Sequence, residues 1–571
     1  MARGIVVALT AAALAGCAGQ GVEAPDLAAV AESLPRAAPR IVLIGLDGAD
    51  WSVARPLMAA GKLPTLSGLV ASGSSGDLRS IEPMISPALW TSMVTGVSPE
   101  RHGIRDFVYK QPGVYAQPIV DSTIRERLAL WNIFSALGRT VGVVDWYATW
   151  PAEQVHGFIV SDRIKTIDPS AAGVTYPAPA SFGTLLADPP PLPALPALER
   201  LTRGFDPLPA GLDKALREDL YRYRVAKQLY AERRPDFFAF YLKGLDAVGH
   251  FYWRFFEPDA DVFSGLERGD TARFGSIIPD YYTLCDQLLA DFLGGLDEET
   301  TVLIASDHGF KPFGRPDNLI FDLDRLFEVL ELLEFEDPGL AARRSERRVR
   351  MSATQLYAHE GTQIVSALGA REQPVYLNVA GRDPQGVIPA DERKRAGAAI
   401  KARLEALRTD LGSPLFAAVR FDEAPAGAGL RQEPDLYLRV NAEVAFDHEL
   451  SIDGRSHDLF DLFFWEYGNI SGTHRPEGVV VARGPAIRAG ARIGGASLLD
   501  IAPTLLYLAG VPVPSDMEGQ VLREMLVDSG SAERLRVSSY ERWIVREPVE
   551  IEAAPLDEEY RERLRALGYV Q

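Results

Sequence analysis

The sequence has only two cysteines in 571 residues, Cys17 and Cys285, and this scarcity excludes a disulfide-built scaffold. It also has no internal apolar run long enough to cross a bilayer as a helix. Basic residues are few relative to acidic ones, 59 against 78, and the formal net charge of -19 disfavours nucleic acid or an anionic membrane as a partner held by charge. The negative net charge does not exclude an anionic substrate, because metal cations bound at the site can outweigh the electrostatic field of distant acidic side chains.

The first residues have the pattern of a bacterial lipoprotein signal. Arg3 precedes an apolar run over 5–14 that is too short for a membrane span, and Leu14-Ala-Gly-Cys17 follows it. We expect residues 1–17 to be a signal peptide, Cys17 to carry a lipid anchor in the membrane, and residues 18–38 to be a linker. The expected location is the bacterial cell envelope, facing the periplasm or the exterior. A plain signal peptide with an incidental cysteine is the alternative.

Short apolar runs rich in β-forming residues alternate with helical patterns along the chain. Such runs are typical of buried strands in a parallel sheet. They cover residues 41–46, 140–144, 237–242, 301–305 and 478–482, with helices such as 220–231 and 281–293 between them. We predict an α/β three-layer sandwich, in which helices cover both faces of a mostly parallel central sheet. In such sheets the ligand site lies beyond the carboxyl ends of the strands.

The alternation is interrupted between residues 313 and 465, where charged helices and short strands predict an inserted cap subdomain. The core is accordingly expected over 39–312 and 466–525. The proline-rich segment 188–196 is expected to be a loop. Residues 526–571 are expected to form a C-terminal tail with an amphipathic helix near 556–568.

Three aspartates and three histidines stand near the ends of predicted strands. Asp47 ends the first strand, Asp307 and His308 end another, and His474 lies in a predicted loop before 478–482. Asp246 and His250 are four residues apart, so they share one side of a helical turn. This donor set suits Zn²⁺, or alternatively Mn²⁺, and two such divalent ions can clamp a phosphoryl group. Each motif alone is as well explained by a turn or a surface pair, and their joint occurrence favours a metal site.

Ser86 is the candidate nucleophile. Pro87 suits the first position of a helix, which predicts Ser86 as the N-cap, where free backbone N–H groups can hold a phosphate. Ser86 could equally be only a helix cap. Thr91 and Ser92, further along the same helix, are rival nucleophiles.

These motifs together resemble the alkaline phosphatase superfamily, and within it the predicted phosphohydrolases and phosphomutases related to type I phosphodiesterase/nucleotide pyrophosphatases. The resemblance rests on Leu46-Asp-Gly48, Ser86–Gly96, Pro99–Gly103, Asp246-x-x-x-His250, Ser306-Asp-His-Gly309 and Gly472-Thr-His474. It implies that Asp246, His250 and His474 bind one metal ion. It further implies that Asp47, Asp307 and His308 bind the other, together with Ser86, which forms a covalent phospho-enzyme.

The sequence departs from the nucleotide pyrophosphatases after the nucleophile, because Leu89-Trp90 replaces their Asn-His pair. Lys243 and Arg105 are therefore candidates for holding the phosphate oxygens. We expect hydrolysis of a small-molecule phosphate ester, a diester or pyrophosphate rather than a monoester, because no arginine is offered near Ser86. The alternatives are a phosphoryl or phospho-headgroup transferase or phosphomutase of the same superfamily, and a non-catalytic metal-bearing surface binding protein. The sequence leaves the oligomeric state open.

Overall fold

The computed structural model describes residues 26–35, 39–115, 117–164, 168–263, 270–313, 323–337, 357–366, 372–423, 431–441, 449–452, 454–459, 470–527 and 536–547. The expected signal peptide with Cys17 and the expected helix near 556–568 lie outside these ranges, so both stay predictions. Within the described ranges, no helix is both long and apolar enough to cross a bilayer.

The centre of the molecule is a nine-stranded sheet. In spatial order its strands are β17 (Ala491–Ser497), β2 (Ser74–Arg79), β16 (Glu477–Arg483), β7 (Thr301–Ala305), β1 (Ile41–Leu46), β6 (Phe237–Leu242), β3 (Val141–Val144), β4 (Gly157–Val160) and β5 (Thr175–Tyr176). The five strands from β7 to β4 run parallel, so their carboxyl ends lie at one edge of the sheet. The runs predicted as strands are confirmed, and four of them lie in this parallel group.

The direction of β16 differs from the prediction of a parallel strand. It runs antiparallel to both of its neighbours, β7 and β2. The reason lies in the preceding residues: β15 (Gly472–Arg475) pairs with β8 (Gly309–Pro312), which follows directly on the carboxyl end of β7. The chain therefore enters β16 at the carboxyl edge of β7 and must run back along it.

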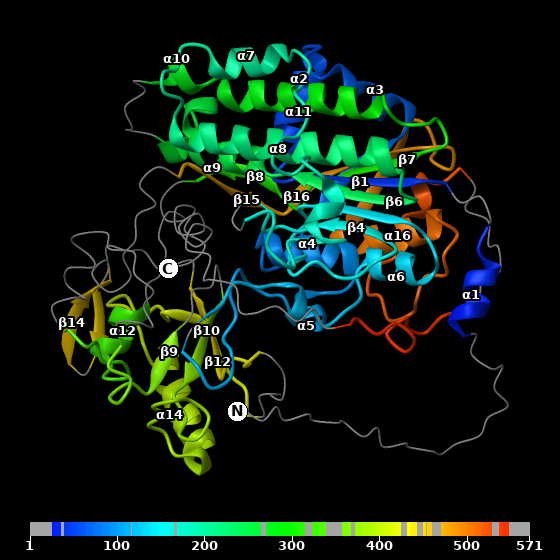
Figure 1. Cartoon of the computed structure of the whole chain (residues 1–571). Coiled ribbons are helices and arrows are strands. Elements are labelled where there is room, and N and C mark those ends of the chain that lie inside the picture. Colours follow the sequence, from blue (N-terminus) through cyan, green and yellow to red (C-terminus); the bar gives the residue numbers. More distant parts are fainter. Residues whose placement is uncertain are drawn as a thin grey trace.

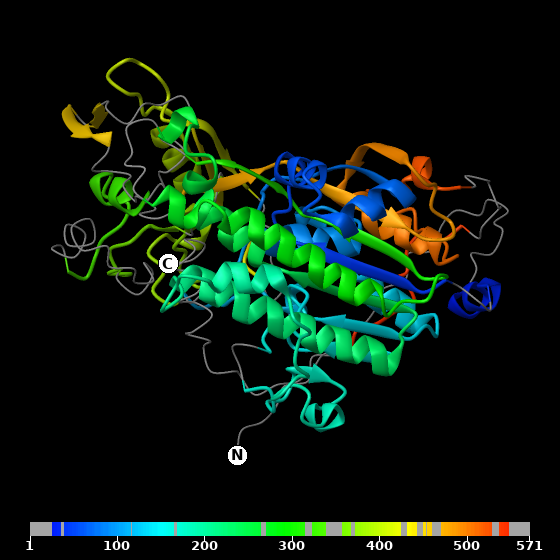
Figure 2. The same cartoon turned by 90° about the horizontal axis from the view of Figure 1, so that it is seen from above.

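Helices cover both faces of the sheet, as Figures 1 and 2 show. One face carries α2 (Trp51–Ala59), α3 (Pro64–Ser72), α7 (Pro196–Thr202), α8 (Ala210–Arg233), α9 (Gly244–Phe256) and α11 (Ile277–Leu293). The other carries α4 (Ser86–Thr95), α6 (Leu130–Ala136) and α16 (Ile501–Leu508). Alternate residues of β1 serve the two cores, with Val42 and Ile44 in one and Ile41 and Leu43 in the other. The predicted three-layer α/β sandwich is confirmed.

The stretch predicted as a linker contains a helix, α1 (Leu27–Ser33). Its Val30 is fully buried in the core cluster that also holds Ile41. A guanidinium N–H of Arg139 donates to the Pro35 carbonyl at 2.6 Å, which ties the segment after α1 to the core. Because α1 lies at the opposite end of the molecule from α14 (Arg393–Glu405) in Figure 1, this part of the chain packs onto the core away from the carboxyl ends of the strands.

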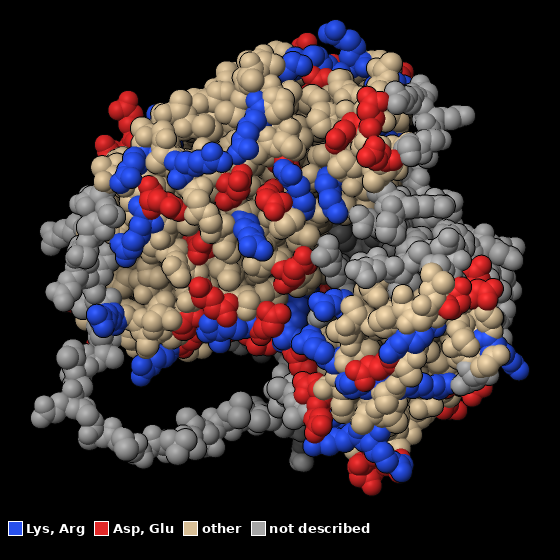
Figure 3. Space-filling model, turned by 180° about the vertical axis from the view of Figure 1, so that it is seen from behind, with Lys and Arg blue, Asp and Glu red and all other residues tan. Residues whose placement is uncertain are grey.

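Most of the described residues between 323 and 459 form a separate unit, which we call the cap. Its elements are α12 (Leu323–Val329), β9 (Ile364–Ser366), β10 (Glu372–Leu377), α14 (Arg393–Glu405), β11 (Phe416–Phe421), β12 (Leu436–Val440), β13 (Glu449–Ile452) and β14 (Arg455–Asp458). Four of these strands form an antiparallel sheet in the order β11-β12-β10-β9. The cap has its own hydrophobic core, and it lies beside the larger unit in Figure 3, where acidic and basic side chains are interspersed on both units.

A segment of the core, residues 103–115, holds the cap in place; we call it the strap. Lys110 Nζ lies 2.6 Å from Asp383 Oδ1 and 2.6 Å from Gln432 Oε1, and its side chain is only 1% exposed. Tyr115 donates its hydroxyl to Asn378 Oδ1 at 2.9 Å. Since the strap follows α4 and α5 (Pro99–His102), it links the helix of Ser86 to the cap.

Candidate active site

The residues predicted as metal ligands lie together at the carboxyl edge of the sheet. Asp47 directly follows β1, and Asp307 and His308 follow the neighbouring strand β7. Asp246 and His250 lie on α9, which begins just after β6, the other neighbour of β1. His474 reaches them from the strand β15 rather than from the predicted loop. Three adjacent parallel strands and the antiparallel pair β8–β15 therefore bring these side chains to one place.

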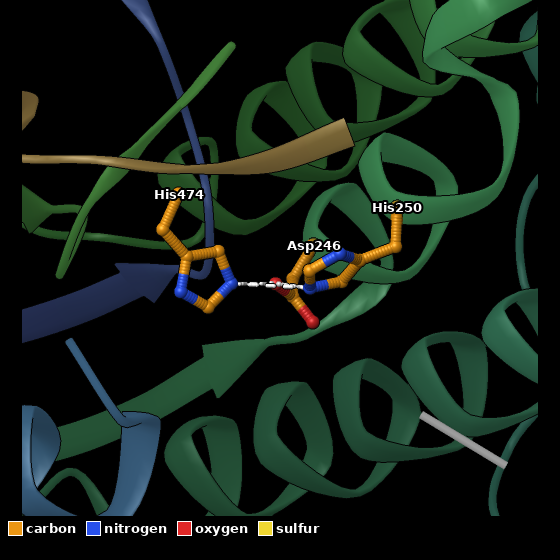
Figure 4. A group of neighbouring side chains, drawn as sticks. All are labelled: Asp246, His250 and His474. Atoms are coloured by element: carbon orange, nitrogen blue, oxygen red, sulfur yellow. Dashed lines mark hydrogen bonds and ion pairs between the residues drawn. The ribbon is translucent and has the colours of Figure 1, made fainter. Parts of the chain in front are cut away.

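Asp246, His250 and His474 form the first group, drawn in Figure 4. His250 Nε2 and His474 Nε2 each lie 3.2 Å from Asp246 Oδ1. The two Nε2 atoms are 3.1 Å apart. Two imidazole nitrogens and a carboxylate oxygen that converge in this way are suited to hold one divalent ion.

Asp47, Asp246 and His308 form a second group. His308 Nε2 lies 3.5 Å from Asp47 Oδ1, 3.5 Å from Asp307 Oδ2 and 3.9 Å from Asp246 Oδ1. The His308 ring also stacks on His474 with 3.6 Å between centroids, so the two groups are contiguous. Asp246, which the resemblance assigned to one ion, thus stands within reach of both.

The orientation of each imidazole is set by a backbone carbonyl. The Nδ1 atoms of His250, His308 and His474 lie 2.9, 3.1 and 3.1 Å from the carbonyl oxygens of Gly472, Gly309 and Met84, respectively. A carbonyl only accepts, so each Nδ1 carries the proton and each Nε2 presents a lone pair. This tautomer is the one that a histidine ligand needs when it binds a metal through Nε2.

Several polar atoms of the site are buried without a hydrogen-bond partner among the described residues: Asp47 Oδ1, Asp307 Oδ2 and His308 Nε2. Burial raises the pKa of Asp47 well above its usual value, and the neighbouring Asp307 and Asp246 raise it further. Burial and then Asp246 raise the pKa of Asp307 to about 8. Orphaned acceptors and crowded carboxylates of this kind are stabilised by a cation. The residues present therefore fit a divalent metal centre.

The raised pKa of Asp307 predicts a pH-dependent stability of the metal-free protein. The ordinary value is 3.8, so between about pH 4 and pH 8 the folded protein keeps a proton on Asp307 that the unfolded chain releases. Stability should fall as the pH rises through this window, by up to about 1.4 kcal/mol per pH unit for one proton. We expect urea midpoints of chelator-treated protein to show this slope and Asp307→Asn to flatten it. Parallel profiles for the two proteins would contradict the assignment.

Two residues that flank Ser86 along the chain, Met84 and Trp90, contact the candidate metal ligands. Met84, two residues before it, accepts the proton of His474 Nδ1, and Trp90, one turn after it, donates its indole N–H to Asp47 Oδ2 at 3.3 Å. Ser86 is 2% exposed and is the first residue of α4, whose N-cap is Ile85, so the prediction of Ser86 as the N-cap is wrong by one position. The Ala88 N–H already donates to the Ile85 carbonyl and Pro87 has no N–H, so this helix end offers fewer free amides than predicted.

The rival hydroxyls have different surroundings. Thr91 Oγ1 is buried without a hydrogen-bond partner in the described structure. Ser92 Oγ lies 2.8 Å from His102 Nε2, and His102 Nδ1 accepts the Ile104 N–H at 3.1 Å. His102 Nε2 therefore carries the proton and donates to Ser92, which is the wrong tautomer for a base acting on that serine. Burial, followed by Arg125, lowers the pKa of His102 to about 3, so this histidine is neutral and structural.

Arg105 and Lys243, the two side chains considered for binding the phosphate oxygens, lie in different parts of the structure. Arg105 lies in the strap, where it donates to Glu433 at 2.9 Å and to the Tyr437 hydroxyl at 2.7 Å, so it binds the cap. Lys243 directly follows β6, is 9% exposed, and places its ammonium 3.7 Å from the ring centroid of Tyr147. Its charge opposes the rise in the pKa of Asp47, so it stands near the metal-ligand groups.

Residues that support the site were not singled out from the sequence. Buried Asp50 accepts from the Arg475 guanidinium at 2.6 Å and from the Phe310 N–H at 2.8 Å, which joins the turn after Asp47 to the strand pair β8–β15 that carries His474. A Cβ on Gly48 or Gly249 would lie 2.6 or 2.7 Å from the Phe310 ring, so these glycines let that ring pack beside the histidines. The signal for Asp50 was weak, because an aspartate before a helix is ordinarily only a cap.

The mostly parallel sheet with a buried carboxylate–imidazole cluster at its carboxyl edge agrees with the family that the sequence matches, which lies in the alkaline phosphatase superfamily. The family model for type I phosphodiesterase / nucleotide pyrophosphatase matches residues 41–461, and the chain belongs to this family. It is therefore a phosphoric-ester hydrolase of the phosphodiesterase/pyrophosphatase type, in a metal-dependent family. A search of curated proteins finds no match.

Similar solved structures include human ectonucleotide pyrophosphatase/phosphodiesterase 5, at 14% identity and a TM-score of 0.48, covering 86% of this chain and 100% of that chain. The murine protein of the same name, inactive and in complex with AMP, has 14% identity and a TM-score of 0.44, with the same coverage of 86% and 100%. Phosphonoacetate hydrolase from Sinorhizobium meliloti in complex with phosphonoformate has 17% identity and a TM-score of 0.43, covering 83% and 96%.

Proposed function

We propose that this protein hydrolyses a phosphodiester or pyrophosphate bond of a small molecule through a covalent phospho-serine on Ser86, at a site that holds two divalent metal ions, Zn²⁺ or alternatively Mn²⁺. The observation that carries the proposal is the convergence of three imidazole Nε2 lone pairs and three carboxylates beside the helix of Ser86. Asp246, His250 and His474 would hold one ion, and Asp47, Asp307 and His308 the other. Ions bound there would lower the pKa of the Ser86 hydroxyl and neutralise the charge on the phosphoryl oxygens.

The chemistry of the chain itself has two steps. In the first, the Ser86 hydroxyl gives up its proton, which solvent passes to the leaving oxygen, and the Ser86 oxygen forms a bond to phosphorus while the bond between phosphorus and the leaving oxygen breaks. In the second, water forms a bond to phosphorus as the bond to Ser86 breaks, and the serine regains a proton. The fixed Nδ1 contacts keep the three imidazoles in one orientation throughout, which reduces reorganisation during both steps.

A diester or pyrophosphate fits better than a monoester because the two candidate cations are not both available. The extra charge of a monoester calls for a dedicated cation, and Arg105 is bound to Glu433 and Tyr437 of the cap. Lys243 supplies one buried positive charge beside Tyr147. We therefore expect the diester activity to exceed the monoester activity.

The test is an assay of the purified protein on aryl phosphate mono- and diesters, after chelator treatment and after adding back Zn²⁺ or Mn²⁺. We expect diester turnover that is lost on chelation and restored by the metal. Metal-loaded protein that turns over neither ester would contradict the proposal. Adding a competing alcohol separates hydrolysis from transfer, because a transferase would give the alkyl phosphate as the main product.

A further inference from the structure

Trp90 stands where the nucleotide pyrophosphatases have a histidine, and in this chain it contacts a metal-ligand residue. Its indole N–H donates to Asp47 Oδ2 at 3.3 Å. The other carboxylate oxygen, Oδ1, is buried without a hydrogen-bond partner in the described part of the chain and lies 3.5 Å from His308 Nε2. Trp90 thus holds Oδ2 of Asp47 by a hydrogen bond, while Oδ1 faces His308 of the second ligand group.

The indole is itself rigidly held. Trp90 is fully buried, its ring meets Trp146 edge-on at 5.1 Å, and it packs against Tyr241 at 5.0 Å. Its backbone carbonyl accepts the Trp146 indole N–H at 3.1 Å. A Cβ on Gly45 would lie 2.5 Å from the Trp90 ring, so the absence of a side chain in β1 is what lets the indole lie against the strand that ends at Asp47.

An indole suits this position chemically because it is a donor only. It can stabilise Oδ2 of the Asp47 anion but cannot accept a proton from the carboxyl group or bind a metal ion in its place. Trp90 also lies one turn after Ser86 on α4, so the same rigid helix that carries the proposed nucleophile orients the carboxylate.

We infer that Trp90 is a positioning residue that fixes the Asp47 carboxylate so that Oδ1 faces the second metal site. The inference rests on the proposed function, because it assumes that Asp47 is a metal ligand. Partners of metal-ligating side chains usually change metal affinity about 10- to 100-fold when they are removed.

The test uses the full chain with Trp90→Phe, which keeps an aromatic ring and removes the N–H. Zn²⁺ affinity is measured by competition with a chromogenic chelator. We expect the affinity for one of two ions to fall about 10- to 100-fold, with two ions still bound at saturation. The matched control is Trp131→Phe: Trp131 is also fully buried and donates to a carboxylate, Glu153 Oε2 at 2.8 Å, but that carboxylate pairs with Arg125 and is no part of the ligand groups. Its substitution should leave the metal affinity unchanged.

A second variant, Trp146→Phe, keeps the Trp90 indole but removes the N–H that holds the Trp90 carbonyl, so it should weaken Zn²⁺ binding by a smaller factor than Trp90→Phe does. Circular dichroism confirms the fold of each variant, and if Trp90→Phe does not fold, Trp146→Phe is compared with the wild type and must bind Zn²⁺ more weakly. Wild-type affinity in Trp90→Phe would overturn the inference while leaving the proposed function intact. A wild-type protein that binds no metal would overturn both.

Discussion

Replacing Ser86 by alanine is expected to lower kcat/KM for a phosphodiester by about 10⁴-fold or more, because the loss of a nucleophile removes the covalent route altogether. The serine is buried in the first turn of α4, between Met84, which orients His474, and Trp90, which contacts Asp47. Removing one hydroxyl from that position changes little packing and leaves Asp47, Asp307 and His308 to hold the second ion, so the metal content should stay at the wild-type value. The measurement is steady-state kinetics of metal-loaded protein, with the metal content determined in parallel.

The rival hydroxyl on the same helix provides the matched control. Thr91→Val removes a buried hydroxyl that has no hydrogen-bond partner in the described structure and keeps the shape of the side chain. We expect wild-type turnover and equal or slightly higher stability. Trapping of a phosphorylated peptide that contains residue 86 would support the assignment directly. Wild-type-like activity in Ser86→Ala, or a large loss in Thr91→Val, would place the nucleophile elsewhere.

The second large effect is expected from Asp246→Asn. Asp246 Oδ1 lies 3.2 Å from His250 Nε2 and from His474 Nε2, and 3.9 Å from His308 Nε2, so it is the carboxylate that both ligand groups share. Burial disfavours its charge, yet in the metal-free protein His250, which can take a second proton on Nε2 beside Asp246, and then His474 hold the pKa of Asp246 well below the usual value, so it is an anion at neutral pH. Metal stabilisation of a phosphoryl transition state contributes several kcal/mol, so its loss should cost on the order of 10³-fold in kcat/KM.

Metal stoichiometry distinguishes a shared ligand from one that serves a single ion. We expect Asp246→Asn to bind fewer ions than His250→Ala, which should lose tight binding at the first group alone. Asp286→Asn is the matched control, because this aspartate is also buried but accepts from Thr65 and Leu66, which lie outside the ligand groups. It should lose some stability and keep its metal. Two ions bound with wild-type affinity in Asp246→Asn would contradict the shared role.

The positions of the ligands along the chain could be predicted because they depend on local patterns. An apolar β-rich run that ends in Asp47, or in Asp307 and His308, marks a strand end in any α/β protein. The four-residue spacing of Asp246 and His250 needs only one helical turn. The α/β fold followed from the same runs, since strands buried on both faces leave a nearly continuous apolar signature.

Contacts between distant segments could not be predicted in this way. The reversed direction of β16 follows from the antiparallel pairing of β15 with β8, and His474 meets Asp246 across 228 positions because this strand pair lies at the carboxyl end of β7. The one-residue error at Ser86 arose because a proline near a helix start does not say which residue is the cap. The contacts between the strap and the cap also join distant segments, and no pattern in either segment predicts that the two meet.

By itself, then, the sequence determined the α/β class, the positions of the main strands along the chain and the six candidate ligands, because hydrophobic periodicity and strand ends depend on neighbouring residues. Tertiary structure alone decided that Asp246 stands between two groups, that each imidazole is turned by a backbone carbonyl, and that Trp90 holds Asp47. These features depend on which strands become neighbours and which helix packs on them, and that choice is made by burial of the two hydrophobic cores rather than by any local pattern.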